Sequence, residues 1–145
     1  MIVSDHSPCT PALKRFAEAD FGTAWGGIAS LQYTLPLLWT EGLAQDVSLP
    51  QLARWTAAAP AQLAGLERRK GVIAPGMDAD FAVFDPGKAW TVTEAATYHR
   101  HKGSPYRGRT LQGKVVRTIL RGETIYDDGK FPSRTRGEFL LKGAL

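Results

Sequence analysis

The chain has 145 residues and carries 18 Lys and Arg against 14 Asp and Glu, a formal net charge of +4. A hydrophobic share of 43% with 22% charged residues is typical of a globular protein and excludes a disordered chain. The basic excess is small and dispersed, so we do not expect nucleic-acid binding. The sequence has no apolar run long enough for a membrane span, so we do not expect one. Cys9 is the one cysteine, which excludes an internal disulfide, and we expect no secretion signal and a cytoplasmic protein.

The first 69 residues have a mainly helical pattern behind one short strand. A β-branched pair at residues 2–3 precedes the polar, turn-rich cluster 4–10, which predicts a short buried strand with functional residues at its carboxyl end. The helical spacing of apolar residues predicts a helix over 28–39 with one buried face. Pro36 is expected to bend this helix or to mark a boundary within it.

A second helix is predicted to begin at Ser48. Ser48 and Gln51 have the spacing of a capping box, in which the serine oxygen accepts an otherwise unpaired backbone N–H. Pro60 is expected to end this helix and to begin the next. The basic triplet 68–70 is interpreted as a solvated helix end, with a phosphate-binding patch as the alternative, and Gly71 is expected to follow that end.

From residue 71 the pattern changes to short strands separated by turns. A turn at Asp85-Pro86-Gly87 is expected to separate the first two strands, and the last two are expected to form a β-hairpin. The predicted strands lie at residues 81–84, 88–97, 114–120 and 124–126.

Asp5 is the first candidate for chemistry. A carboxylate at the carboxyl end of a buried strand lies where α/β barrels place metal ligands and general bases, and the alternative is an Asp that caps a loop. His6 would point the other way on a strand and is interpreted as a supporting or packing residue. Cys9 could act as a nucleophile only beside an oriented base, which the spacing does not supply.

His99 and His101 have the spacing of a pair of metal ligands on one strand face. Their surroundings are polar and no third ligand lies close in sequence, so an exposed loop is favoured over a metal site. The four tryptophans are interpreted as core residues, since they are not interleaved with cations as a nucleic-acid surface would require.

Several segments resemble a known family. The chain is similar to allantoinases, within the cyclic amidohydrolase superfamily, over nearly its whole length. SDHSPC and HKGSPYRG favour allantoinases over dihydropyrimidinases and dihydroorotases. The matching segments are VSDHSPCTPALK at 3–14, AWGGIASLQ at 24–32, GVIAPGMDADFAVFDP at 71–86, HKGSPYRGR at 101–109 and VVRTILRGETIYDDG at 115–129.

The resemblance implies an α/β plus β fold in two parts. Residues 1–69 would be the C-terminal end of a (β/α)₈ TIM barrel, with its last strand, a loop and helices. Residues 70–145 would be the C-terminal part of a small composite β-sandwich. A complete barrel takes roughly 250 residues, so we expect the last third of an amidohydrolase, with apolar helix faces left exposed.

The resemblance also implies an activity, the hydrolysis of the ring amide of allantoin to allantoate in purine catabolism. Such enzymes hold two divalent metals, expected to be zinc, with manganese, cobalt or nickel as alternatives. Asp5 would ligate one metal and carry the proton from the attacking water to the leaving nitrogen. Ser7, Trp25 and Gly26 would contact the substrate. The complete enzyme would be a homo-oligomer, often a tetramer in the family.

The departures from the family pattern limit what the chain can do alone. The family's HxH pair, carboxylated lysine and two further histidines cannot be placed in this sequence, and His99 and His101 are not that pair. We therefore expect the isolated chain to hold no metal pair and to be inactive. The alternatives are a related hydantoinase or dihydropyrimidinase activity, or a non-catalytic module that pairs with another chain.

Overall fold

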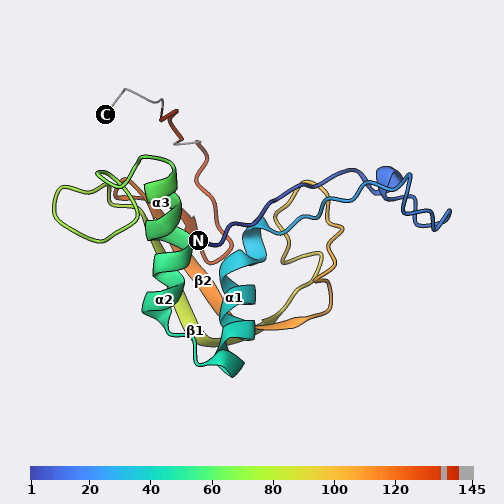
Figure 1. The fold of residues 1–145 in the computed structure, drawn as a ribbon, viewed down its shortest axis with the longest axis horizontal. Helices are drawn as coiled ribbons and strands as arrows, with labels where there is room; N and C mark the ends of the chain where they lie inside the picture. Colours follow the sequence, from blue (N-terminus) through green and yellow to red (C-terminus); the bar gives the residue numbers. More distant parts are fainter. Residues whose placement is uncertain (135–136, 141–145) are drawn as a thin grey trace.

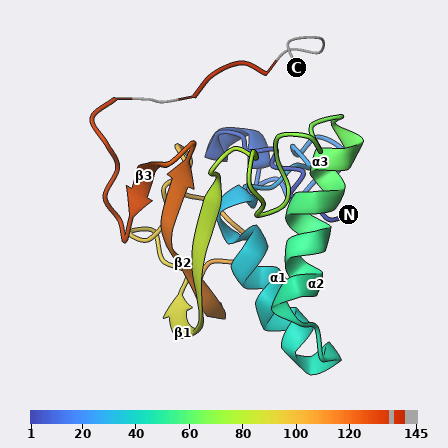
Figure 2. The same cartoon turned by 90° about the vertical axis from the view of Figure 1, so that its left-hand side faces the viewer.

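The computed structural model describes residues 1–134 and 137–140. Helices cover one face of a three-stranded antiparallel sheet, and the N-terminal residues form an arm that extends away from this body (Figures 1 and 2). In the sheet β2 is the central strand, and it pairs with β1 on one side and with β3 on the other. The elements are α1 (Thr34–Gly42), α2 (Leu49–Ala53), α3 (Ala59–Leu63), β1 (Phe81–Thr91), β2 (Thr110–Leu120) and β3 (Glu123–Asp127).

The core lies between α1 and β2. Tyr33, Val92 and Leu111 are its fully buried members, and we name them the Tyr33 cluster. The Tyr33 hydroxyl shares a hydrogen bond of 2.7 Å with Thr97 Oγ1, so the one polar atom that this ring buries has a partner. Trp90 packs against the cluster and donates its indole N–H to the Gly113 carbonyl at 2.9 Å.

The predicted strand at residues 2–3 does not form. The segment is extended, but Val3 is 59% exposed and the described residues give it no neighbouring strand. A strand is stable only where a neighbour pairs its backbone groups, so an isolated β-branched run stays irregular. The prediction of a buried strand is therefore wrong for this chain.

The helix predicted over 28–39 begins three residues later. A 3₁₀ turn over Leu31–Tyr33 leads directly into α1, and residues 28–30 are not helical. Pro36 is buried in the first turn of α1, where a residue without an N–H interrupts no helical hydrogen bond. The change from 3₁₀ to α winding lies two residues before Pro36, which agrees with the boundary expected near it.

The start of the second helix is confirmed. Ser48 accepts the Gln51 N–H, and the Gln51 side chain accepts the Ser48 N–H at 2.8 Å, so both halves of the capping box are present. Leu52, on the buried side of α2, is almost completely covered.

Pro60 does not end this helix, contrary to the prediction. A π-helical turn, Arg54–Ala58, joins α2 to α3 without a break, and Ala59 donates its N–H to the carbonyl five residues before it. In that register residue 60 would pair with the Trp55 carbonyl, but proline has no N–H to donate. The Ile2 N–H instead donates to the Trp55 carbonyl at 2.8 Å. This hydrogen bond joins the N-terminal arm to the helix.

The turn predicted at residues 85–87 is a bulge inside one continuous strand. Asp85 lies opposite Lys114 and Ala89 lies opposite Gln112, so β1 carries extra residues between two positions of β2. Pro86, which cannot donate to a sheet, is tolerated because it lies in this unpaired stretch. The two strands predicted on either side of the turn are therefore one strand, β1, which ends at Thr91.

The predicted hairpin is confirmed as β2 and β3. Leu120 lies opposite Glu123, and the two residues between them, Arg121 and Gly122, have φ values of 48° and 82°. Two consecutive residues with positive φ give a turn whose twist matches that of the strands it connects.

The basic triplet at 68–70 lies beyond the end of α3, and of its three residues Arg68 is exposed to solvent while the other two are paired. Arg69 and Lys70 form ion pairs with Asp78 at 3.1 and 2.9 Å, and Lys70 also binds Asp80. Asp80 in turn accepts the Arg121 N–H at 2.8 Å, which ties the segment after α3 to the hairpin. The hydrogen bond from Lys70 lowers the pKa of the Asp78 carboxyl. Burial opposes charge on Asp80, but the hydrogen bonds from Lys70 and Arg121 lower its carboxyl pKa overall.

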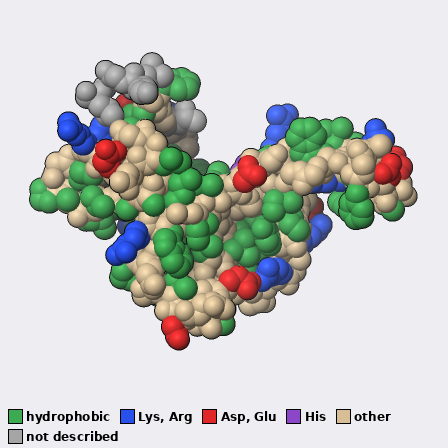
Figure 3. Space-filling model, in the orientation of Figure 1, with side chains coloured by type: hydrophobic (Ala, Val, Ile, Leu, Met, Phe, Trp, Pro, Cys, Tyr) green, Lys and Arg blue, Asp and Glu red, His purple; other side chains and the backbone are tan. Residues whose placement is uncertain are grey.

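Exposed apolar side chains lie on the arm and between the helices and the sheet, as the sequence led us to expect. A cavity of about 1180 Å³ separates α2 and α3 from the edge of β1, and most of its lining is apolar. Figure 3 shows hydrophobic side chains gathered across the middle of one face and on the arm. Leu63 and Phe21 are 73% and 98% exposed. No helix of the described residues is long and apolar enough to cross a membrane.

We predict that Leu111→Ala lowers the free energy of unfolding by about 2–5 kcal/mol, because it leaves a void in the Tyr33 cluster. Urea unfolding followed by tryptophan fluorescence measures this change. Leu63→Ala removes the same atoms from an exposed position and should change the value by less than about 0.5 kcal/mol. Equal losses in the two variants would contradict the placement of the core.

We predict that Lys70→Met destabilises the chain at neutral pH and that the difference from the parent chain shrinks in acid. The lowered carboxyl pKa values of Asp78 and Asp80 stabilise the fold above the ordinary carboxyl pKa, and this stabilisation is lost as the pH falls through the folded-state values. Urea midpoints at pH 7 and pH 3 measure the effect. Lys130→Met removes the same charge elsewhere, and a matching pH dependence in that variant would contradict the assignment.

Candidate functional site

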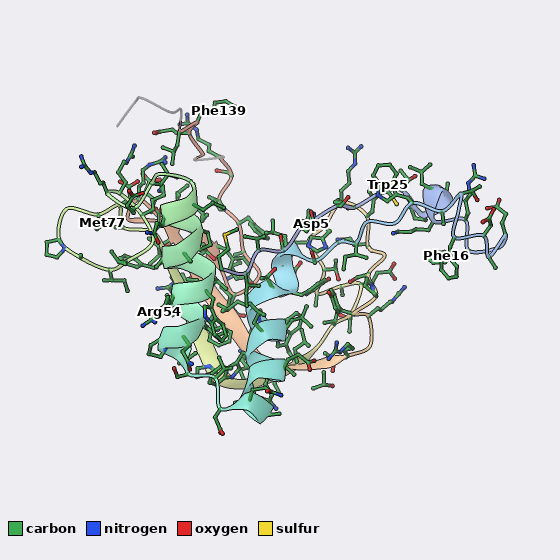
Figure 4. All side chains as sticks on the ribbon, in the orientation of Figure 1. Asp5, Phe16, Trp25, Arg54, Met77 and Phe139 are labelled. Atoms are coloured by element: carbon green, nitrogen blue, oxygen red, sulfur yellow. The ribbon has the colours of Figure 1, made fainter. Side chains whose placement is uncertain are left out.

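The candidate site lies where the N-terminal arm meets the start of α1 (Figures 1 and 4). Two segments of the arm, an outgoing one and a returning one, run side by side. Ser7 donates its N–H to the Ile28 carbonyl at 2.9 Å, and Trp25 donates its N–H to the Leu13 carbonyl at 2.9 Å. Lys14 adds a side-chain hydrogen bond of 2.9 Å to the Trp25 carbonyl.

Asp5 is exposed at the base of this arm and has a left-handed backbone, with φ at 44°. Among residues other than glycine, Asp and Asn adopt this conformation most readily. No hydrogen bond within the described part of the chain occupies its carboxylate, so the alternative role as a loop cap is wrong. The Ser4 carbonyl, directly before Asp5, accepts the Ser30 hydroxyl at 2.8 Å.

His6 has a more specific role than packing. Its Nδ1 accepts two backbone N–H groups, those of Ser30 at 3.0 Å and Leu31 at 3.1 Å. These belong to the first turn of the helical segment, whose N–H groups have no partner within a helix. Since Nδ1 is an acceptor, the neutral imidazole carries its proton on Nε2. His6 and Ser30 are 24 positions apart in the sequence, so no local sequence pattern predicts this contact.

His99 packs beside His6 instead of lying in an exposed loop. The two ring centroids are 4.8 Å apart, and the His99 and Tyr33 rings form a T-shaped pair with their centroids 5.3 Å apart. Its Nε2 accepts the Gln32 N–H at 3.4 Å, while its Nδ1 is buried without a hydrogen-bond partner in the described residues. Burial lowers the pKa of His99, so its neutral form is favoured. The exposed-loop interpretation is therefore wrong for His99.

Of the three predicted substrate contacts, Ser7 lies near Asp5. Trp25 and Gly26 lie further along the arm. Ser7 is half-buried against Gly27, where an added Cβ would overlap the serine side chain and its carbonyl. Trp25 is 49% exposed, so the interpretation of this tryptophan as a core residue is wrong. Gly26 is exposed, with open space where a side chain would lie. Figure 4 shows Trp25 on the arm beyond Asp5.

The described residues do not form a metal centre by themselves. Within residues 1–134 and 137–140, no three His, Cys, Asp or Glu side chains converge on a point where they could hold an ion. Asp5 offers a free carboxylate, but the Nδ1 of His6 is already engaged by backbone N–H groups. His99 and His101, the sequence candidates for a metal pair, do not join such a group.

Comparison with known proteins identifies the family. The sequence profile of the amidohydrolase family matches residues 25–126, which is more than half of the chain. The chain belongs to the amidohydrolase family. This confirms the resemblance noted in the sequence.

Curated relatives and solved structures agree with this assignment. The chain is 49% identical to an allantoinase of Streptomyces avermitilis over 97% of its length, and 42% identical to an allantoinase of Saccharomyces cerevisiae over the same share. It spans 31% and 30% of those two proteins, about a third of their length. A D-hydantoinase (dihydropyrimidinase) from Thermus sp. superposes with a TM-score of 0.80 at 27% identity, covering 90% of this chain and 29% of that structure. A dihydropyrimidinase from Brevibacillus agri superposes with a TM-score of 0.80 at 28% sequence identity. The match covers 88% of this chain and 28% of that structure.

The amidohydrolase family generally uses a binuclear metal centre, and the residues described here do not fit such a centre on their own. One exposed carboxylate binds a divalent ion weakly, because stable sites need several converging ligands. The chain therefore contributes at most part of a metal site, and we derive no catalytic step through a metal from these residues.

We predict that Gly27→Ala lowers the free energy of unfolding by about 1–3 kcal/mol, because the new methyl group would displace Ser7 and the segment that carries Asp5. Gly26→Ala is the matched control, since it adds the same group at the neighbouring position in open space and should cost less than about 1 kcal/mol. Urea unfolding compares the two variants. A larger loss in Gly26→Ala would contradict the close approach at Gly27.

Proposed function

We propose that the chain is the part of an allantoinase-like cyclic amidohydrolase that supplies the carboxylate of Asp5 to a site completed by polypeptide outside these 145 residues. The observation that carries this proposal is the 49% identity to an allantoinase over 97% of the chain. The exposed Asp5, left-handed and with no internal hydrogen bond to its carboxylate, supports it, because this group is free to meet a substrate.

The proposed reaction is the hydrolysis of the ring amide of allantoin to allantoate, a step of purine catabolism. Water adds to the amide carbonyl, and the C–N bond of the ring then breaks. Asp5 takes a proton from the attacking water and returns it to the leaving nitrogen, a transfer that a carboxylate within hydrogen-bond reach can perform. Ser7, Trp25 and Gly26 are the proposed substrate contacts. When bound, the family's divalent ions, proposed to be two zinc with manganese, cobalt or nickel as alternatives, supply an activated water.

The proposal divides the chain at the segment after α3. Residues 1–69 would be the end of a metal-dependent hydrolase barrel, and residues 70–145 the C-terminal part of a composite β-sandwich. The order of the elements along the chain, with the helices before residue 69 and the strands after residue 80, supports this division. The complete enzyme would be a cytoplasmic homo-oligomer, with a tetramer as the family precedent.

Two alternatives have specific support. The superposed hydantoinase and dihydropyrimidinase structures favour a related activity on hydantoins or dihydropyrimidines, but at 27–28% identity they are less similar in sequence than the allantoinases. The three-stranded sheet and its buried core favour a non-catalytic module that pairs with another chain. A well-behaved monomer with cooperative unfolding would support the module.

The test is a chimera in which this chain replaces the matching third of the Streptomyces avermitilis allantoinase. We expect the chimera to hydrolyse allantoin faster than hydantoin or dihydrouracil, and the isolated chain to be inactive even with added zinc or manganese. Asp5→Asn in the chimera should lower kcat/KM about 10²–10⁴-fold, because it removes the proton acceptor.

Asp46→Asn is the matched control, since Asp46 is also exposed and left-handed, with φ at 53°, but lies in the turn after α1. It should leave kcat/KM unchanged. Full activity in the Asp5→Asn chimera, or allantoin turnover by the isolated chain, would overturn the proposal. If the chimera hydrolyses hydantoin faster than allantoin, the proposed activity becomes that of a hydantoinase.

A further inference from the structure

We propose that His6 is a positioning residue that holds the backbone turn carrying the Asp5 carboxylate, by accepting the backbone N–H groups of Ser30 and Leu31. The inference rests on the role proposed for Asp5 above. It extends that role by naming the group that sets the conformation of the acid. The alternative is that His6 only stabilises the junction between the arm and α1.

The backbone of Asp5 needs an external constraint. Its φ of 44° lies in a region that residues other than glycine occupy rarely, and such a conformation persists where the surroundings hold it. The carboxylate of Asp5 has no hydrogen bond in the described part of the chain, so its own side chain does not supply this constraint. The constraint must come from the residues on either side.

The residues on either side of Asp5 are both hydrogen-bonded to one short segment of the returning arm. Before Asp5, the Ser4 carbonyl accepts the Ser30 hydroxyl at 2.8 Å. After it, His6 Nδ1 accepts the Ser30 and Leu31 N–H groups at 3.0 and 3.1 Å. Asp5 therefore lies between two residues that are each hydrogen-bonded to the returning segment of the arm. Figure 4 shows Asp5 at the base of the arm, above the start of α1.

His6 makes two of these three hydrogen bonds, and both donors share the one lone pair of its Nδ1. The Ser30 and Leu31 N–H groups begin a helical segment and have no helical acceptor. Removal of Nδ1 would leave the Ser30 N–H without its partner at a partly buried position and the Leu31 N–H without its partner at an exposed one. The ring itself is held by His99, at 4.8 Å between centroids. His99 in turn packs on Tyr33, and this links the Asp5 turn to the core.

The test compares two variants that differ in where they place an acceptor. In His6→Asn the amide oxygen can occupy the place of Nδ1, whereas His6→Gln carries its oxygen one bond further, near the place of Nε2. Both variants are made in the chimera described above. The readouts are kcat and KM for allantoin and the hydrogen exchange of the Ser30 and Leu31 amides, with the β2 amides as the internal reference for folding.

We expect His6→Gln to lower kcat about 10- to 100-fold with KM changed less than about threefold, because a misplaced proton acceptor affects the reaction more than binding. The Ser30 and Leu31 amides should exchange about tenfold faster or more. His6→Asn should restore both values to near those of the parent. Ser104→Ala, which removes a bond of 3.3 Å to the Ala29 carbonyl, loosens the same segment without touching residues 4–7 and should leave kcat unchanged.

Three outcomes overturn the inference: unchanged amide exchange in His6→Gln, faster exchange with unchanged kcat, or equal losses of kcat in His6→Asn and His6→Gln. The last two would assign His6 a structural role only. A chimera without any allantoin turnover would instead overturn the proposed function. In that case the exchange of the Ser30 and Leu31 amides still decides whether His6 holds the Asp5 turn.

Discussion

The packing of Tyr33 in the core is the interaction on which the geometry of the site depends. Its ring is fully buried and its hydroxyl is paired with Thr97, so the ring has one orientation. His99 packs on the edge of that ring, and His6 packs on His99. A chain of three rings thus runs from the hydrophobic core to the turn that carries Asp5.

Features whose partners lie close in sequence could be predicted, and features whose partners are distant could not. The capping box of Ser48 and the turn of the β2–β3 hairpin involve neighbouring residues, so composition and spacing were sufficient to predict them. Pro60 is tolerated inside a helix because a π-helical turn shifts the register and the distant Ile2 uses the freed carbonyl. Pro86 stays inside β1 because pairing with β2 continues on both sides of it. No local pattern contains these compensations.

The same distinction explains what could be foreseen of the site. Asp5 was proposed as a site residue from a motif of contiguous residues and its resemblance to a family. His6 was interpreted as a supporting or packing residue, but its partners could not be predicted because its acceptor atom pairs with N–H groups 24 and 25 residues away. The interpretation of Trp25 as a core residue failed because apolar composition does not distinguish a core side chain from one on an extended arm. The sequence therefore identifies the chemical group, and the fold identifies what holds it.

The position of Asp5 separates what this chain determines from what it requires. Under the role proposed for His6, the conformation of Asp5 depends on His6, Ser30 and the core, all of which lie within the described residues. A metal centre depends on several ligands that converge, and the described residues supply no such group. The relatives are about three times longer, so the rest of a centre has room in polypeptide that this chain does not match. Under the proposed function, Asp5 is therefore a carboxylate whose orientation is set inside the chain and whose reactivity depends on groups outside it.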